Sequence, residues 1–177
     1  VLLAPVSYQK LTDDEVYELY ATVSRSLSVP LCVYDNPGTT HFDFSDELHG
    51  RIAQLPQVRS IKIPPVVNDI EKARERVARL RALIPSEVTI GISGDPAAAT
   101  GLSAGCDAWY SVIGGLYPHT ALALTRVAQA GDTQQVNALS SALEPLWALY
   151  REYGGSLRVA ATIAEVTGKV SQPCLPQ

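Results

Sequence analysis

The chain has 177 residues, a net charge of −4 and 46% apolar residues, enough apolar content for one sizeable globular core. Charged residues make up 18% of the chain and mix both signs, which argues against partners such as nucleic acid or an acidic membrane surface. No apolar run approaches the roughly 18 residues that a membrane-spanning helix needs. The three cysteines are far apart and lack CxxC spacing, so we expect reduced thiols in a cytoplasmic protein.

The start of the chain is unusual. The whole sequence contains no methionine, not even at position 1. Its first residues lack a signal-peptide pattern and are apolar residues that predict a buried strand. We therefore expect this chain to be a segment of a larger protein.

Short apolar runs rich in valine and isoleucine recur along the chain and predict strands. Their starts lie about 20 to 30 residues apart, the length of one βα unit. The predicted strands cover residues 1–6, 31–34, 60–63, 88–92 and 109–113.

Amphipathic segments with capping residues follow these strands and predict helices. Thr12 and the acidic residues after it indicate a capping box, and Ser45 indicates a second cap. The charged face of the third helix is typical of a solvated surface. The predicted helices begin after Thr12 and Ser45 and then cover residues 70–84, 95–104, 118–131, 133–150 and 156–167, before a Pro-punctuated tail.

Five βα units followed by two helices without an intervening strand predict an α/β fold with a parallel sheet covered by helices. The five strands fit either an open doubly wound sheet or the last five units of a TIM (β/α)8 barrel, which needs roughly 250 residues. For the barrel we expect residues 1–131 to form the five βα units and residues 132–177 a C-terminal helical extension. The absence of GxGxxG and P-loop motifs weakens a nucleotide-binding interpretation.

Lys62 is the strongest candidate for chemistry. Only four lysines occur, and this one lies inside an apolar strand between Ile61 and Ile63. Because side chains alternate along a strand, the isoleucines and Lys62 face opposite sides. Burial disfavours a lysine's charged form, and a neutral amine can attack a ketone to form a Schiff base. The alternative is a lysine that extends its amine to solvent near a strand end.

Tyr34 ends the preceding strand in the same manner, before a polar turn that includes Thr39 and Thr40. A tyrosine one strand away from the lysine can relay a proton during imine chemistry. The alternative is a core tyrosine with a satisfied hydroxyl.

The next two strands end in further candidates. In Ser93-Gly94-Asp95, the glycine allows close approach to a ligand, while a plain helix start capped by Asp95 is an equal alternative. Tyr110 and Ser111 precede a glycine pair. The three histidines lack a second ligand at useful spacing, so we expect no metal site.

Together these motifs resemble the dihydrodipicolinate synthase / N-acetylneuraminate lyase family of class I aldolases, over nearly the whole chain. The resemblance rests on the order and spacing of three features: residues 34–38 against a Tyr-Asn-x-Pro-Gly turn, a lysine 28 residues after the tyrosine of that turn, and a Ser-Gly-Asp loop. The matching stretches are LAPVSYQKLTDDEV, VPLCVYDNPGTT, VRSIKI, ISGDPAAA, AGCDAWYSVIGG and GGSLRVAATIAEVTG.

The resemblance implies a TIM barrel with C-terminal helices, commonly assembled as a homotetramer, or otherwise a dimer. It implies a lyase without a cofactor, in which Lys62 forms the Schiff base with pyruvate or a related 2-oxo acid and Tyr34 relays protons. Gly94 and the backbone near Tyr110 would line the 2-oxo acid site, and an aldehyde would be the second substrate. Tyr8 roughly matches the family's further relay tyrosine.

Two departures limit this transfer. Asp35 replaces the usual asparagine after the tyrosine, and Thr39 replaces the arginine that holds the second substrate's carboxylate in true dihydrodipicolinate synthases. A threonine lacks the bidentate fork of an arginine. We therefore expect another aldehyde partner, selected in part by Thr39 and Thr40. The alternatives are a true dihydrodipicolinate synthase of lysine biosynthesis, a non-catalytic relative that binds a small acid, and an open-sheet binding domain.

Overall fold

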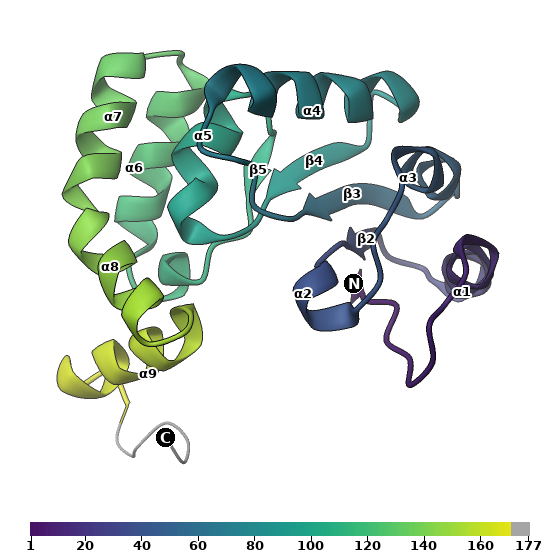
Figure 1. Ribbon diagram of the computed structural model, residues 1–177, viewed down its shortest axis with the longest axis horizontal. Helices are drawn as coiled ribbons and strands as arrows, with labels where there is room; N and C mark the ends of the chain where they lie inside the picture. The colour runs from purple at the N-terminus through teal and green to yellow at the C-terminus, as the bar shows by residue number, and fades with distance from the viewer. Residues whose placement is uncertain (171–177) are drawn as a thin grey trace.

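The computed structural model describes residues 1–170, in which five parallel strands form one sheet in chain order (Figure 1). The strands are β1 (Leu2–Leu3), β2 (Leu31–Tyr34), β3 (Val58–Ile63), β4 (Thr89–Ile92) and β5 (Ala108–Trp109). The α/β class is confirmed. A doubly wound sheet reverses its strand order at a switch point. Across the described strands the order runs without reversal, so the open-sheet alternative is wrong and the sheet is a partial barrel.

Helices follow each strand and lie around one face of the sheet (Figure 1). Thr12 accepts a hydrogen bond from the Glu15 backbone and Glu15 reaches back to Thr12, which confirms the predicted capping box. Ser45 caps its helix as predicted. The helices are α1 (Asp13–Ser26), α2 (Pro37–Thr40), α3 (Asp46–Ala53), α4 (Ile70–Leu83), α5 (Ala98–Ser103), α6 (Pro118–Gln129), α7 (Thr133–Ala142), α8 (Glu144–Glu152) and α9 (Ser156–Val166), with 3₁₀ turns η1 (Asp95–Ala97) and η2 (Ile113–Gly115).

Several predicted boundaries were wrong. The predicted helix 133–150 is divided at Leu143 into α7 and α8, because Pro145 supplies no backbone N–H and begins a new helix. The predicted turn after Tyr34 contains the short helix α2. The first strand is only Leu2–Leu3, and the last stops at Trp109 rather than at residue 113. The part of the predicted Pro-punctuated tail at residues 171–177 lies outside the described residues.

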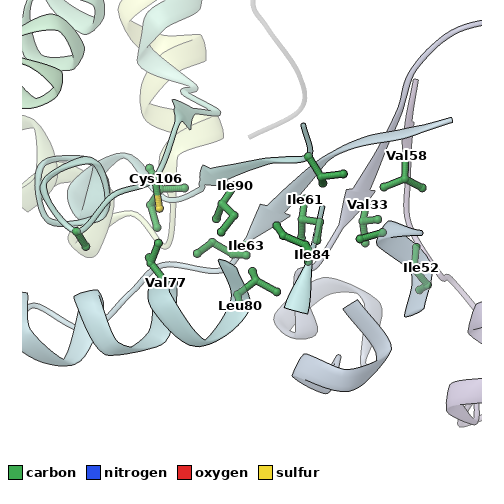
Figure 2. Close-up of a cluster of buried hydrophobic side chains, with 14 of the residues drawn as sticks. Val33, Ile52, Val58, Ile61, Ile63, Val77, Leu80, Ile84, Ile90 and Cys106 are labelled. Carbon is green, nitrogen blue, oxygen red and sulfur yellow. The ribbon is translucent and has the colours of Figure 1, made fainter. Parts of the chain in front are cut away.

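The core lies between the sheet and its helices. Alternate residues of β2, β3 and β4 are buried there, including Val33, Ile61, Ile63 and Ile90, as Figure 2 shows. Leu80 of α4 packs against them in the same cluster. Each fully buried aliphatic side chain contributes roughly 1.5–3 kcal/mol, so this layer holds the strands in register.

The opposite face of the sheet carries the remaining side chains. Register pairs Cys32 with Ser60, Tyr34 with Lys62, and Lys62 with Gly91 across three neighbouring strands. Cys32, Tyr34, Ser60 and Lys62 are all half-buried. This face would be the interior of a closed barrel. Separately, none of the helices in the described part of the chain is both long and apolar enough to cross a membrane.

Asp95 fastens the C-terminal part of the fold to the sheet. Its buried carboxyl group accepts hydrogen bonds from Trp109 Nε1 at 3.1 Å and from the backbone N–H groups of Val112 at 3.0 Å and Ile113 at 2.8 Å. The Tyr150 hydroxyl of α8 lies 3.4 Å from the same carboxyl group. The alternative interpretation of Asp95 as a helix cap is therefore wrong, because its carboxyl oxygens accept hydrogen bonds from residues far along the chain. These bonds also turn the chain into η2 and so end β5 early.

We predict that Asp95→Ala lowers the free energy of unfolding by about 3 kcal/mol or more, because the half-buried N–H of Val112, the buried N–H of Ile113 and the Trp109 indole lose their acceptor. Urea denaturation of the full-length protein measures this loss. Asp95→Asn keeps one oxygen acceptor and should lose less.

The matched control is Asp132→Ala, which removes an exposed helix cap that accepts from the Gln135 backbone. Its cost should be about 1 kcal/mol. Equal losses for Asp95→Ala and Asp132→Ala would contradict the tethering role of Asp95.

Candidate functional site

Lys62 and Tyr34 lie side by side at the carboxyl ends of β3 and β2. The Lys62 Nζ atom is 4.1 Å from the centroid of the Tyr34 ring. The two residues are register partners, and the backbone N–H of Asp35 donates to the Lys62 carbonyl at 3.0 Å. Both side chains are half-buried, and Ile61 and Ile63 point to the opposite face, where they are buried. The structure thus brings together the two residues that the sequence selected.

The turn after Tyr34 is held by its own side chains. Asn36 Nδ2 donates to the Tyr34 hydroxyl at 2.9 Å, which leaves the hydroxyl proton free for another acceptor. The Thr40 hydroxyl is buried and donates to the Asn36 carbonyl at 3.0 Å. Thr39 is exposed. Thr40 therefore closes the turn, and the binding role expected for Thr39 and Thr40 stays a prediction.

The Ser93-Gly94 loop lies beside the end of β3. The Ser93 hydroxyl donates to the Ile63 carbonyl at 2.6 Å, and the Ser93 backbone N–H donates to the same oxygen at 3.1 Å. Gly94 has φ 77°, and a Cβ there would stand 2.6 Å from Pro65 Cγ. Only glycine allows this backbone and this approach. The loop therefore lies next to the strand that carries Lys62.

Tyr110 follows β5 and lies across the inner face of the sheet. Its hydroxyl is 2.7 Å from Ser60 Oγ and 3.2 Å from Cys32 Sγ. Burial raises the pKa of Tyr110 to about 12, so its hydroxyl keeps its proton at neutral pH. The sequence predicted that the backbone near Tyr110 lines the 2-oxo acid site. In the structure, the Tyr110 side chain contacts Ser60 and Cys32, which lie below Lys62 and Tyr34 on their strands.

The remaining candidates are separate from this group. Tyr8 is fully exposed in the loop after β1, and its expected relay role stays a prediction. Ser111 accepts a hydrogen bond from the Gly114 backbone at 2.9 Å and stabilises η2. Within residues 1–170, no three histidine, cysteine or acidic side chains gather as they would around a metal ion.

A buried pair of titratable residues lies directly behind Tyr34, and sequence reasoning missed it. Asp35 Oδ2 is 3.4 Å from His49 Nε2, close enough for a charge interaction but without hydrogen-bond geometry. His49 is fully buried and stacks on Phe44, with ring centroids 4.9 Å apart. Asp35 was noted only as a departure from the family pattern. Its partner is 14 residues away on α3, and helical spacing alone did not indicate that contact.

Burial shifts both groups toward their neutral forms. Burial raises the pKa of Asp35 to about 7, assisted by Asp43 and Asp46 and opposed by Arg76. Burial lowers the pKa of His49 to about 4, with Arg76 acting in the same direction. Asp35 also lines a cavity of about 500 Å³ on the helix-covered side of the sheet, away from Lys62.

We predict opposite pH dependences of stability for variants of this pair. The raised pKa of Asp35 stabilises the fold at acidic pH, and this contribution is lost as pH rises from about 4 to about 7. The lowered pKa of His49 stabilises the fold at neutral pH, and this contribution is lost as pH falls from about 6.5 to about 4. The two slopes largely offset each other in the wild type.

As pH rises from about 4 to about 6.5, the free energy of unfolding of Asp35→Asn should therefore increase, and that of His49→Leu should decrease. Each change should be roughly 2–4 kcal/mol relative to the change in the wild type. Urea denaturation across this pH range measures both slopes. Parallel curves for the two variants would contradict the assigned pKa directions.

Comparisons with known proteins identify the family of this chain. The model of the dihydrodipicolinate synthetase family matches residues 1–176. A 4-hydroxy-tetrahydrodipicolinate synthase of Methylococcus capsulatus is 30% identical over 145 residues, covering 82% of this chain and 48% of that protein. The chain thus spans about half the length of this curated relative.

Solved structures support the same relationship. A dihydrodipicolinate synthase of Agrobacterium tumefaciens is 42% identical with a TM-score of 0.90, covering 99% of this chain and 60% of that chain. A protein of Pseudomonas aeruginosa described as a putative dihydrodipicolinate synthetase is 29% identical with a TM-score of 0.84. The match covers 100% of this chain and 59% of that chain. The five βα units therefore correspond to part of a TIM barrel, and the chain belongs to the dihydrodipicolinate synthetase family.

Proposed function

We propose that the full-length protein is a class I lyase that joins or cleaves a carbon–carbon bond between pyruvate, or a related 2-oxo acid, and an aldehyde. The observation that carries this proposal is the Lys62 amine, set on the inner face of β3 and 4.1 Å from the Tyr34 ring. A lysine amine can form an imine, and a tyrosine in contact with it through its ring has a hydroxyl that can relay a proton. Membership of the family supports it further.

The proposed reaction uses the chain's own groups and no cofactor. The Lys62 amine adds to the ketone carbon of the 2-oxo acid, and loss of water forms the imine. Loss of a proton from the neighbouring carbon then gives an enamine, whose carbon attacks the aldehyde. Hydrolysis returns the free amine and releases the product. Tyr34 relays protons in these steps, with its hydroxyl oriented by the Asn36 side chain.

The 2-oxo acid carboxylate would lie near the Ser93-Gly94 loop and the backbone around Tyr110. Ser93 is anchored to the end of β3 at Ile63, one residue from Lys62. An oligomer, as a tetramer or a dimer, is part of this proposal. Exposed apolar side chains on α8 and α9, such as Leu149 and Leu157, are available for contacts between subunits.

We predict that pyruvate with borohydride traps a reduced adduct on the Lys62 peptide of the full-length protein, detected by mass spectrometry after digestion. Lys62→Ala should abolish the adduct. Lys72→Arg, which alters an exposed lysine paired with Asp69, should retain it. Tyr34→Phe should still form the adduct but lose roughly 100-fold in turnover, because it removes the proton relay. An adduct on any other lysine would refute the role of Lys62.

A second candidate is the reaction named for the relatives, that of a 4-hydroxy-tetrahydrodipicolinate synthase. The names of these relatives favour it. The exposed Thr39, which replaces the carboxylate-binding arginine of the family pattern, opposes it. The same Schiff base serves both candidates, so the difference lies in the aldehyde alone.

We predict that the full-length wild type uses the aldehyde of 4-hydroxy-tetrahydrodipicolinate synthases poorly, and that Thr39→Arg raises kcat/KM for it by roughly tenfold or more, the worth of one charge-assisted hydrogen bond. Steady-state kinetics with pyruvate and that aldehyde measures this. Thr39→Lys adds the same charge without the planar fork and should gain less. Efficient wild-type turnover would select the second candidate.

A further inference from the structure

The Tyr110 ring occupies the space that a side chain at position 91 would fill. A Cβ at Gly91 would stand 2.2 Å from Tyr110 Cε2 and 2.6 Å from Cδ2. Gly91 is the register partner of Lys62 on β4. The ring therefore covers the β4 position next to Lys62 in the sheet.

Hydrogen bonds from three strands hold this ring in place. The Tyr110 hydroxyl meets Ser60 on β3 and Cys32 on β2, at 2.7 Å and 3.2 Å. The Thr89 hydroxyl on β4 donates to the same Ser60 oxygen at 2.8 Å. Ser60 and Cys32 lie one inward-facing position below Lys62 and Tyr34 on their strands. The tip of the ring is thus fixed one inward-facing position below Lys62 and Tyr34 along their strands.

We propose that Tyr110 is a specificity-determining residue, which narrows the site on the Gly91 side of Lys62 and selects pyruvate over 2-oxo acids with a longer carbon chain. This inference rests on the proposed Schiff-base function. Its basis is that Tyr34 contacts the Lys62 amine from β2, while the Tyr110 ring covers Gly91 on β4 and reaches Ser60 of β3 beneath Lys62.

The physical reason lies in the shape of the imine. An imine carbon is planar, and its carboxylate and its carbon substituent diverge within that plane. A ring that covers Gly91 beside Lys62 leaves less lateral room for a longer carbon substituent than an uncovered glycine would. One additional methylene in a tight apolar pocket is worth roughly 10- to 200-fold in selectivity. The cost should fall on binding and imine formation rather than on later proton transfers.

The test traps imines with borohydride in the full-length wild type and in two variants, Tyr110→Phe and Tyr110→Ala. Pyruvate and 2-oxobutyrate compete at equal concentration, and mass spectrometry gives the ratio of reduced adducts on the Lys62 peptide. The wild type should favour pyruvate roughly tenfold or more. Tyr110→Phe keeps the ring and should keep that preference. Tyr110→Ala opens the Gly91 side and should bring the ratio close to one.

Tyr153→Ala, at an exposed tyrosine of the C-terminal helices, is the matched control and should leave the ratio unchanged. Circular dichroism monitors folding, and Tyr110→Leu replaces Tyr110→Ala if the alanine variant unfolds. A folded variant without the ring that keeps the wild-type ratio overturns the inference, as does a wild type that accepts both acids equally. A wild type without any adduct at Lys62 overturns the proposed function, and this inference with it.

Discussion

Side-chain alternation along β3 is the constraint on which the rest of the structure depends. Ile61 and Ile63 are drawn into the layer between sheet and helices, and this forces the intervening Lys62 onto the opposite face. The orientation of Lys62 also determines which residues of the neighbouring strands share its face, because register partners in adjacent strands point to the same face. Tyr34 and Gly91 reach the site through this pairing, so a shift of one residue in β3 would move Lys62 into the core.

Much of this arrangement could be predicted from sequence because it follows from short-range periodicity. The strand around Lys62 and the caps at Thr12 and Ser45 follow from local patterns. The closeness of Tyr34 to Lys62 follows from the order of the βα units, which makes their strands neighbours. The tether at Asp95 could not, since its partners lie up to 55 residues away. The same holds for the Asp35–His49 pair and for the Tyr110 ring, whose contacts are set by how whole βα units pack. Local patterns specify which face a residue takes, and tertiary packing decides which residue it meets.

Family membership and the local departures from the family pattern bear on different parts of the chemistry. The family relationship supports the roles proposed for Lys62 and Tyr34. The departures at Thr39 and Asp35 concern the surroundings of these two residues. Thr39 is exposed in the turn, and Asp35 is buried behind Tyr34. Conversion of an asparagine to an aspartate at a buried position introduces a group that titrates near neutrality, and the opposing shift of His49 limits its effect on the fold. The proposed Schiff-base chemistry and the proposed change in aldehyde selectivity therefore rest on different residues.

The contact between Gly91 and the Tyr110 ring has a consequence for how this chain and its relatives can diverge. With the ring in place, any side chain at position 91 meets it at less than contact distance, so an aromatic residue at 110 obliges glycine at 91. The converse does not hold, because a glycine at 91 tolerates any neighbour. Evolution can therefore lose the aromatic ring first and the glycine second, but not in the reverse order. The two positions should vary together among relatives, with the glycine as the slower to change.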